Sequence, residues 1–344
     1  MMPPLAVTLG DPAGIGPEIT GKAWAARHDQ ALPCFFAVGN EEAIRRVWAG
    51  PIAVISTPED AHGVFGKALP LLPVADCGDA IPGAPDLETA RCALDTLGLA
   101  VGLAQSGTAS GLVTGPVSKS QLQAIGFTHP GQTEFVAERC GVAPGNVAMM
   151  LAGPDLRVIP ITIHIPLADV PNVLTSELII SRGRTAAIGL QRNFGIQNPR
   201  IAVAGLNPHA GEQGMMGDEE TRIIAPAIAA LAAEGFDVFG PVSPDALFTP
   251  RARQGYDLAL CMYHDQGLIP LKALCVDEGV NMSLGLPIIR TSVDHGTACD
   301  IAWQGKANSS SLSPLILSGD IHTLNQTLTL HGIRLTPGPH ENRS

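Results

Sequence analysis

The sequence contains few aromatic and few charged residues. Only 4% of its 344 residues are aromatic and 15% are charged, whereas 45% are hydrophobic. Without many aromatic rings, the core has to be built mainly from Ala, Val, Leu and Ile, a mixture typical of parallel sheets covered by helices on both faces. The apolar content also excludes a largely disordered chain.

Positive charge is scarce as well. The 21 Lys and Arg residues are outnumbered by 32 Asp and Glu, which gives a formal net charge of −11. This balance argues against nucleic acid as a partner but leaves room for a small anionic substrate in a local basic pocket. No apolar run is long enough to span a bilayer, and Met1-Met2-Pro3-Pro4 does not resemble a secretory signal. We therefore expect a cytoplasmic protein with no membrane contact.

The seven cysteines are widely spaced, and none belongs to a Cys-x-x-Cys pair. Their arrangement therefore argues against both a zinc ribbon and a dithiol redox site. An odd number of scattered cysteines predicts reduced thiols, most of them buried.

Short apolar runs alternate with helical patterns along the whole chain, which predicts an α/β fold. Its length suggests about two domains, and the lack of a flexible linker suggests that the chain crosses between them more than once. The expected strands are Leu5–Leu9, Cys34–Val38, Ile52–Ile55, Leu112–Thr114, Val147–Leu151, Val158–Ile163, Ile201–Ala204 and Leu258–Met262. The expected helices are Leu87–Gln105, Glu177–Leu190 and Glu219–Ala233, and Pro337–Ser344 is expected to be a loose tail.

Three histidines, His164, His209 and His264, closely follow predicted strands. Ligands of open parallel sheets bind outside the carboxyl ends of the strands, so the three side chains have a common place to converge. Three imidazoles with open positions would form a catalytic divalent-metal site. The alternative is that each histidine only caps or hydrogen-bonds its own loop. Asp265 is placed to orient a histidine or to transfer a proton.

Two glycine-containing segments stand out. Gly10–Glu18 follows the first strand and opens a helix, but Ile19 stands where a dinucleotide-binding loop would need its third glycine, so we interpret the segment as a tight turn. The second runs from Asp294 to Ala302 and continues through Asn308. Its small residues allow close approach to a ligand, with Asp300 a candidate for a ribose and Asn308 for an adenine edge.

Lys272, Asn281 and Arg290 lie in the stretch after His264. Two scarce basic residues near a candidate metal site suggest recognition of phosphate or carboxylate. Arg290 follows the apolar run Leu286–Ile289, which predicts a position at a strand end. The alternative interpretation is a surface ion pair.

The two glycine segments together resemble the isocitrate and isopropylmalate dehydrogenase superfamily. That resemblance implies a two-domain α/β fold with the active site in the interdomain cleft. We expect one domain of residues 1–130 with 285–344, and a second of residues 131–284 that carries the metal ligands and the dimer interface. The resemblance also implies contacts with NAD or NADP by the second segment, at His295, Gly296, Thr297, Asp300 and Asn308.

A closer resemblance covers nearly the whole chain, and the sequence is identified as a member of the 4-hydroxythreonine-4-phosphate dehydrogenase family of vitamin B6 biosynthesis. The matching segments are Gly10–Glu18, Thr114–Lys119, Gly131–Phe135, Leu206–Gly211, Met262–Gly267 and Arg290–Thr297. The resemblance implies NAD(P)-dependent oxidation of 4-phosphohydroxy-L-threonine at C3 to 2-amino-3-oxo-4-(phosphooxy)butanoate. Decarboxylation to 3-amino-2-oxopropyl phosphate then follows.

The same resemblance implies a homodimer whose active site is completed by the partner subunit. The divalent metal (Zn, Mg or Co) would be held by His164, His209 and His264. Substrate contacts are implied at Gln132, Thr133, Lys272, Asn281 and Arg290, and the catalytic candidates are Asp265, Asp245 and Lys272.

One position departs from the family pattern, because many members carry histidine where this chain has Gln132. A glutamine does not titrate near neutrality, which puts an acid–base role there in doubt. This departure keeps open a family member with another substrate, which is the first of three alternatives. They are a family dehydrogenase acting on a phosphorylated sugar acid or an aromatic cis-dihydrodiol, a metal-dependent hydrolase or aldolase without nicotinamide, and a non-enzymatic metabolite-binding protein.

Overall fold

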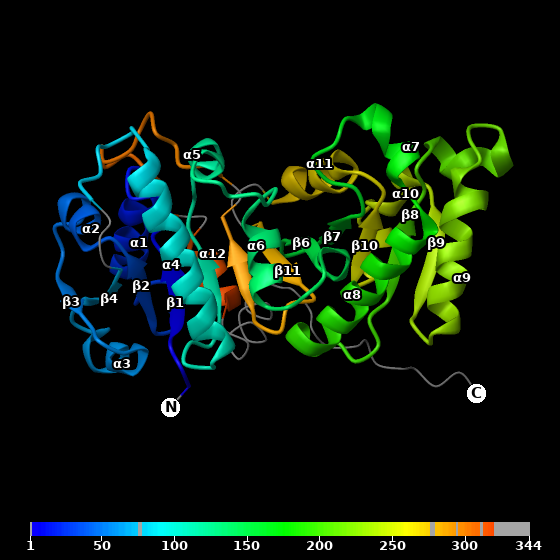
Figure 1. Cartoon of the computed structure of the whole chain (residues 1–344). Helices are drawn as coiled ribbons and strands as arrows, with labels where there is room; N and C mark the ends of the chain where they lie inside the picture. The colour runs from blue at the N-terminus through cyan, green and yellow to red at the C-terminus, as the bar shows by residue number, and fades with distance from the viewer. Residues whose placement is uncertain (1, 75–77, 276–278, 294, 310–311, 320–344) are drawn as a thin grey trace, which may run out of the picture. The chain divides into compact units, whose positions relative to one another are not determined.

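The computed structural model describes residues 2–74, 78–275, 279–293, 295–309 and 312–319. These residues form two compact units (Figure 1). Unit 1 contains Met1–Pro144 and the segment that begins at Val280, and unit 2 contains Gly145–Gly279. The division therefore falls after residues 144 and 279, where the sequence suggested 130 and 284. Asp294 and the predicted tail Pro337–Ser344 lie outside the described residues.

Unit 1 is built on strands in the order β3-β4-β2-β1-β5-β12-β11. Neighbouring strands are parallel except for β11 and β12, and the register pairs Leu5 with Phe35 and Arg290 with Leu112. The strands are β1 (Leu5–Thr8), β2 (Phe35–Gly39), β3 (Ile52–Val54), β4 (Leu69–Pro73), β5 (Leu112–Thr114), β11 (Val280–Leu284) and β12 (Arg290–Ser292).

The helices of unit 1 cover this sheet with apolar stripes. The longest, α4, starts at Asp86, whose carboxylate accepts hydrogen bonds from the backbone N–H groups of Glu88 and Thr89, and it packs on β1 and β2. Helix α12 packs on β5, β11 and β12 and contacts α1. The helices are α1 (Gly16–Ala25), α2 (Glu41–Val47), η1 (Pro58–Asp60), α3 (Ala61–Val64), α4 (Leu87–Gln105), α5 (Lys119–Ala124), α6 (Gln132–Arg139) and α12 (Leu312–Gly319).

Unit 2 has the strand order β6-β7-β10-β8-β9. Strands β7, β10, β8 and β9 are mutually parallel, and β6 runs antiparallel to β7. Their bounds are β6 (Ala148–Ala152), β7 (Arg157–Pro160), β8 (Ile201–Ala204), β9 (Val238–Val242) and β10 (Leu258–Cys261). The core between this sheet and its helices includes Val158, Ala202, Ala259 and Leu271.

The helical segments of unit 2 are η2 (Pro144–Asn146, which begins one residue earlier), η3 (Leu167–Asp169), α7 (Val170–Val173), α8 (Ser176–Phe194), η4 (Pro208–Gly214), the π-helix η5 (Glu220–Ile224), α9 (Ala225–Ala233), α10 (Pro244–Leu247), η6 (Ala252–Gly255) and α11 (His264–Leu274). Helix α8 is capped at Thr175, whose hydroxyl accepts from Leu178 N–H, and it ends at Gly195 in the left-handed region.

The predicted α/β class is confirmed, and helix Leu87–Gln105 and the strands Leu112–Thr114 and Ile201–Ala204 have the predicted bounds. The predicted strand Val158–Ile163 instead ends at Pro160, and the first turn of the predicted helix Glu219–Ala233 is a π-turn. Strand β4 was missed because Pro70 and Pro73 interrupt its apolar run. Within the described part of the chain, no helix combines the length and the apolar character needed to cross a membrane.

Five cysteines are free, as predicted: Cys34, Cys140, Cys261, Cys275 and Cys299. Among these five only Cys261 is buried, so the prediction that most of the thiols are buried is wrong. Cys92 is disulfide-bonded, so the prediction of a reduced thiol is wrong at this position, and Cys77 lies outside the described residues. Wide spacing in sequence says nothing about which sulfur atoms meet in space, so the pattern could not reveal this bond.

Candidate active site

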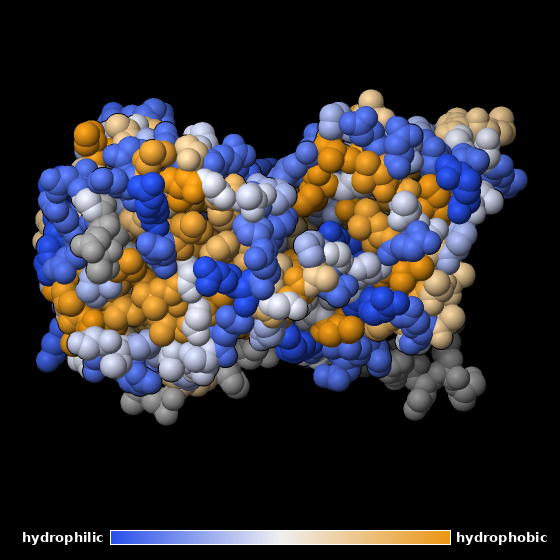
Figure 2. Space-filling model, in the orientation of Figure 1, coloured by the Kyte–Doolittle hydropathy of each residue, from blue (hydrophilic) through white to orange (hydrophobic). Residues whose placement is uncertain are grey.

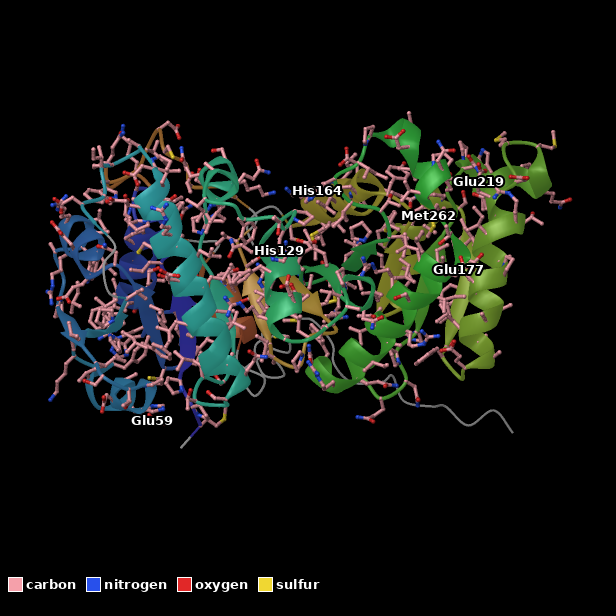
Figure 3. The ribbon with its side chains drawn as sticks, in the orientation of Figure 1. Glu59, His129, His164, Glu177, Glu219 and Met262 are labelled. Atoms are coloured by element: carbon pink, nitrogen blue, oxygen red, sulfur yellow. The ribbon has the colours of Figure 1, made fainter. Side chains whose placement is uncertain are left out.

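Four side chains follow the carboxyl ends of four neighbouring parallel strands of unit 2. In sheet order, His164 follows β7, His264 follows β10, His209 follows β8 and Asp245 follows β9. We call this row the histidine edge, and Figure 3 labels His164 on it. Parallel strands lie about 4.8 Å apart, so the strand order decides which of these residues are neighbours.

His164 and His264 are in contact, with ring centroids 5.5 Å apart and ring planes inclined by 44°. Two imidazoles bound to one tetrahedral ion at about 2.0–2.1 Å have centroids about 5 Å apart, so this pair fits two ligands of a common cation. The Nδ1 atom of His264 lies 2.7 Å from Asp265 Oδ1. An ionised carboxylate only accepts hydrogen bonds, so this contact fixes the proton on Nδ1 and leaves Nε2 as a metal ligand.

His209 lies at the start of a run of five residues in the left-handed region, with φ 52° at His209 and φ 56° at Gln213. Left-handed geometry costs a non-glycine residue about 1–2 kcal/mol, so the loop needs support from its surroundings. Buried Glu220 provides it, because its carboxylate accepts from Asn207 N at 2.8 Å and from Asn207 Nδ2 at 3.1 Å. The backbone of His164 is also left-handed, at φ 46°. Such strain is typical of functional loops.

Asp245 is exposed, and its Oδ1 accepts from Ser243 Oγ at 2.5 Å and from Ala246 N at 2.9 Å. The Ser243 hydrogen bond is the main cause that lowers the pKa of Asp245, and the backbone N–H of Ala246 and nearby His209 act in the same direction. A more acidic carboxyl group is a weaker proton acceptor near neutrality, which argues against Asp245 as a general base.

Within the histidine edge, a ring contact joins His164 and His264. Among the residues that the structure describes, no group of three or more His, Cys, Asp and Glu side chains could hold a metal ion. The strand order β7-β10-β8 places His264 between His164 and His209.

Arg290 forms the centre of a second cluster, in unit 1. Its Nη1 donates to Thr133 Oγ1 at 2.8 Å and to Ser283 Oγ at 2.9 Å, and its Nη2 donates to Thr114 Oγ1 at 3.0 Å. Burial lowers the pKa of Arg290 to about 10, while nearby Glu134 opposes that shift. The guanidinium is thus buried mainly among neutral hydroxyls, and a phosphate or carboxylate would compensate its charge.

The environment of Arg290 corrects two expectations. The residue opens β12 rather than following a strand, because Leu286–Ile289 forms the turn between β11 and β12. Its side chain is only 2% exposed, so the alternative of a surface ion pair is wrong. The apolar run before Arg290 was taken for a strand, but the run, with Pro287 in it and Gly285 before it, connects the two antiparallel strands.

Gln132 is the first residue of α6, beside Thr133. Its Nε2 donates to the carbonyl oxygen of Gly115 at 3.2 Å, and within the described part of the chain its buried Oε1 has no hydrogen-bond partner. A carbonyl oxygen only accepts, which sets the orientation of the amide. The Oε1 atom of Gln132 is therefore left as an acceptor for a ligand.

The remaining substrate candidates lie apart from this cluster or at its rim. Asn281 is half-buried on β11 and is paired with Ser292 of β12. Lys272 is exposed in the last turn of α11, in unit 2. Gln132, Thr133, Asn281 and Arg290 thus belong to unit 1, and Lys272 belongs to unit 2 with the histidine edge.

The cofactor candidates form a loop after β12, residues 295–309, which we call the 295–309 loop. Gly296, Asp300 and Asn308 are exposed on it. His295 Nδ1 lies 3.0 Å from the Gly296 oxygen, and Thr297 Oγ1 lies 3.2 Å from Cys299 Sγ. The loop therefore offers several side chains to a ligand from a single surface segment.

Sequence reasoning missed Thr114, Ser283 and Glu220. Thr114 begins one of the segments that match the family, which was a usable signal, but its hydroxyl gave no hint of a contact with Arg290. Ser283 lies in a five-residue strand that was not predicted. Glu220 lies beside charged and polar residues at the start of a helix, where a glutamate is usually exposed, but it is buried. Thr114 lies 176 residues from Arg290 in sequence, and the pairing of β5 with β12 brings the two together. Ser283 and Glu220 lie nearer in sequence, at 7 residues from Arg290 and 13 residues from Asn207, and the local fold brings them into contact.

The fold and these two clusters define an α/β enzyme scaffold with a candidate anion site and a candidate metal site. The family model for Pyridoxal phosphate biosynthetic protein PdxA matches residues 31–316, and the chain belongs to this family.

Two relatives support the same assignment. A 4-hydroxythreonine-4-phosphate dehydrogenase of Zymomonas mobilis is 53% identical over 90% of this chain and 93% of its own length. The crystal structure of the Klebsiella pneumoniae enzyme of the same name covers 94% of this chain and 99% of its own, with 40% identity and a TM-score of 0.86. A terephthalate 1,2-cis-dihydrodiol dehydrogenase from Burkholderia xenovorans is more distant, with 28% identity and a TM-score of 0.62 over 97% of this chain and 98% of its own.

Proposed function

We propose that this chain is an NAD(P)-linked dehydrogenase that oxidises 4-phosphohydroxy-L-threonine at C3 and releases carbon dioxide to give 3-amino-2-oxopropyl phosphate. The observation that carries the proposal is the 53% identity, over 90% of the chain, with a relative named for this substrate. The buried, hydroxyl-lined Arg290 supports it, because the substrate is an anion.

Arg290 and Lys272 are proposed to bind the anionic groups of the substrate. Arg290 is preorganised by its three hydroxyl partners, so little side-chain entropy is lost when an anion arrives. Thr133 and Asn281 complete the polar surroundings. Gln132 is assigned the part of an acceptor, which suits a hydroxyl or ammonium of the substrate.

His164, His209 and His264 are proposed to hold a divalent cation, for which zinc, magnesium and cobalt are candidates. The contact of His164 with His264 supports this ligand set, and the third ligand is proposed to be completed across a homodimer. A cation bound there would supply positive charge that stabilises negative charge on the substrate oxygen, both during hydride transfer and during decarboxylation.

Asp265 is proposed to take the proton of the C3 hydroxyl, with Asp245 the weaker candidate. Asp265 is exposed beside the ring that it orients, so one carboxylate oxygen holds His264 and the other remains within reach of a ligand. Hydride acceptance is assigned to NAD or NADP bound by His295, Gly296, Thr297, Asp300 and Asn308.

A homodimer is proposed because apolar side chains are exposed on each segment that carries a histidine of the edge. Leu167, Met215 and Ile269 are 66%, 84% and 66% exposed. They belong to the segment after His164, the end of the His209 loop and helix α11. Figure 2 shows part of the apolar surface of the chain. Exposed apolar groups gathered around a polar site mark an interaction surface.

We expect Ile269→Glu to weaken the dimer by about 30-fold or more, because a charge placed in an apolar interface loses its hydration. Activity should fall with it at low protein concentration. Sedimentation equilibrium and turnover measured over a protein dilution series check this. Ile188→Glu is the matched control, since Ile188 is 50% exposed on α8, which carries none of the three histidines. Equal dimer affinity in the wild type and the Ile269→Glu variant would contradict the assignment.

The second candidate is a family dehydrogenase acting on an aromatic cis-dihydrodiol or a phosphorylated sugar acid. The likeness to the Burkholderia xenovorans dihydrodiol dehydrogenase and the presence of Gln132 favour keeping it. The dihydrodiol dehydrogenase is 28% identical to this chain, whereas a relative named 4-hydroxythreonine-4-phosphate dehydrogenase is 53% identical. The phosphorylated threonine is therefore the first candidate substrate.

The deciding experiment follows NAD(P)H formation from each candidate substrate, with and without a chelator. We expect turnover with 4-phosphohydroxy-L-threonine, complete loss on chelation and recovery when zinc, magnesium or cobalt is added back. Turnover with a dihydrodiol alone would favour the second candidate, and turnover that resists chelation would exclude the metal site.

A further inference from the structure

The segment Gly10–Glu18 does not have the glycine pattern of a pyrophosphate loop, and its contacts suggest another task. It lies against the 295–309 loop. Ile15 N donates to Thr297 O at 3.1 Å, and Trp303 Nε1 donates to Pro12 O at 3.3 Å. A Cβ atom on Gly14 would approach Thr297 Cβ to 3.0 Å, so glycine permits the close contact.

Lys22, one turn beyond this segment on α1, makes the most complete contact with the loop. Its Nζ donates to Glu18 Oε1 at 2.7 Å, to Gly305 O at 2.8 Å and to Ala307 O at 2.6 Å. An ammonium group has three protons, so all of its donors are used. Glu18 is buried, and its Oε1 also accepts from Ala307 N at 3.0 Å.

Lys22 and Glu18 together hold both polar groups of the Ala307 backbone, directly before the cofactor candidate Asn308. Exposed surface ion pairs contribute little, but here the carboxylate is buried and the ammonium also binds two carbonyl oxygens. The Lys22–Glu18 pair therefore does more than join two turns of α1. It also binds the 295–309 loop, since Lys22 contacts Gly305, which lies 283 residues away in sequence.

We propose that Lys22 and Glu18 are positioning residues for the nicotinamide cofactor. They fix the Gly305–Ala307 turn, so that Asp300 and Asn308 meet the adenosine end of NAD(P) in an ordered loop. This rests on the proposed function, which assigns the cofactor to that loop. Without the Lys22 contacts the turn has to be ordered during binding, which weakens affinity for the cofactor.

The test is Lys22→Met, which keeps the length of the side chain and removes the three donors. We expect the Kd and KM for NAD(P) to rise about tenfold or more. The KM for 4-phosphohydroxy-L-threonine and the metal content should stay within twofold of the wild type. Glu18→Gln should likewise raise the Kd and KM for NAD(P) and leave the substrate KM and the metal content unchanged. This second variant keeps the test informative if Lys22→Met folds poorly. Lys22→Arg, which restores the charge and several donors, should recover part of the affinity.

Glu41→Gln is the matched control, because Glu41 and Arg45 form an exposed i,i+4 ion pair at 2.8 Å on α2. The Glu41→Gln variant should leave the Kd and KM for NAD(P) and the KM for the substrate unchanged. Cofactor affinity is measured by calorimetric titration of the full chain. Unchanged affinity in Lys22→Met and Glu18→Gln, even with a lower melting temperature, would overturn the inference alone. A wild-type chain that binds neither NAD nor NADP would overturn the proposed function as well.

Discussion

His264→Ala is expected to lower turnover by on the order of a thousandfold or more and to deplete the bound metal. His264 follows β10, the middle one of the three strands that precede the histidines, and it contacts His164 and is oriented by its contact with Asp265. Loss of this ligand would remove the charge stabilisation that a bound cation supplies, which is worth several kcal/mol. His209→Ala is expected to abolish turnover for the same reason.

Metal content measured by mass spectrometry, beside steady-state kinetics, checks this prediction. Asp265→Asn should weaken metal affinity by about 10- to 100-fold, because the amide holds the His264 ring less firmly. His28→Ala is a suitable control, since His28 is exposed in unit 1 and lies outside both clusters. Full activity of His264→Ala or His209→Ala without bound metal would refute the proposed metal site.

Arg290→Met is expected to reduce kcat/KM for the phosphorylated substrate by about 10²- to 10³-fold, corresponding to roughly 3–4 kcal/mol. The reason is that the anion loses its buried, charge-assisted donors. The free energy of unfolding should change far less, by under about 2 kcal/mol. Removal of a buried charge relieves a desolvation cost, and this offsets the loss of hydrogen bonds to Thr114, Thr133 and Ser283.

Arg157→Met provides the matched control for Arg290→Met. Arg157 is buried at the start of β7, its pKa is likewise lowered to about 10 by burial, and its Nη1 donates to Asp257 O. It lies at the opposite end of that strand from the histidine edge, so we expect unchanged substrate affinity. Kinetics and chemical unfolding of both variants separate the roles. A normal KM in Arg290→Met would show that the anion binds elsewhere.

The sequence alone determined the α/β class of the fold and the positions along the chain where candidate functional residues follow strands. Helix α4 could be predicted to the residue because Asp86 caps it and its apolar stripe is regular. The strands before the histidines could be found because a buried strand is a short apolar run with polar residues behind it. These are local properties, and each depends on only a few neighbouring residues.

Only the tertiary structure decided which of these groups meet. The strand order places β10 between β7 and β8, so His164 contacts His264. Likewise, Arg290 is buried among hydroxyls from β5, α6 and β11, and Lys22 binds the loop after β12. Strand order and loop packing follow from non-local pairing, and a local sequence pattern does not specify its partner. The sequence therefore specifies which candidate functional residues are present, whereas the strand order and loop packing of the folded chain determine which of them are in contact.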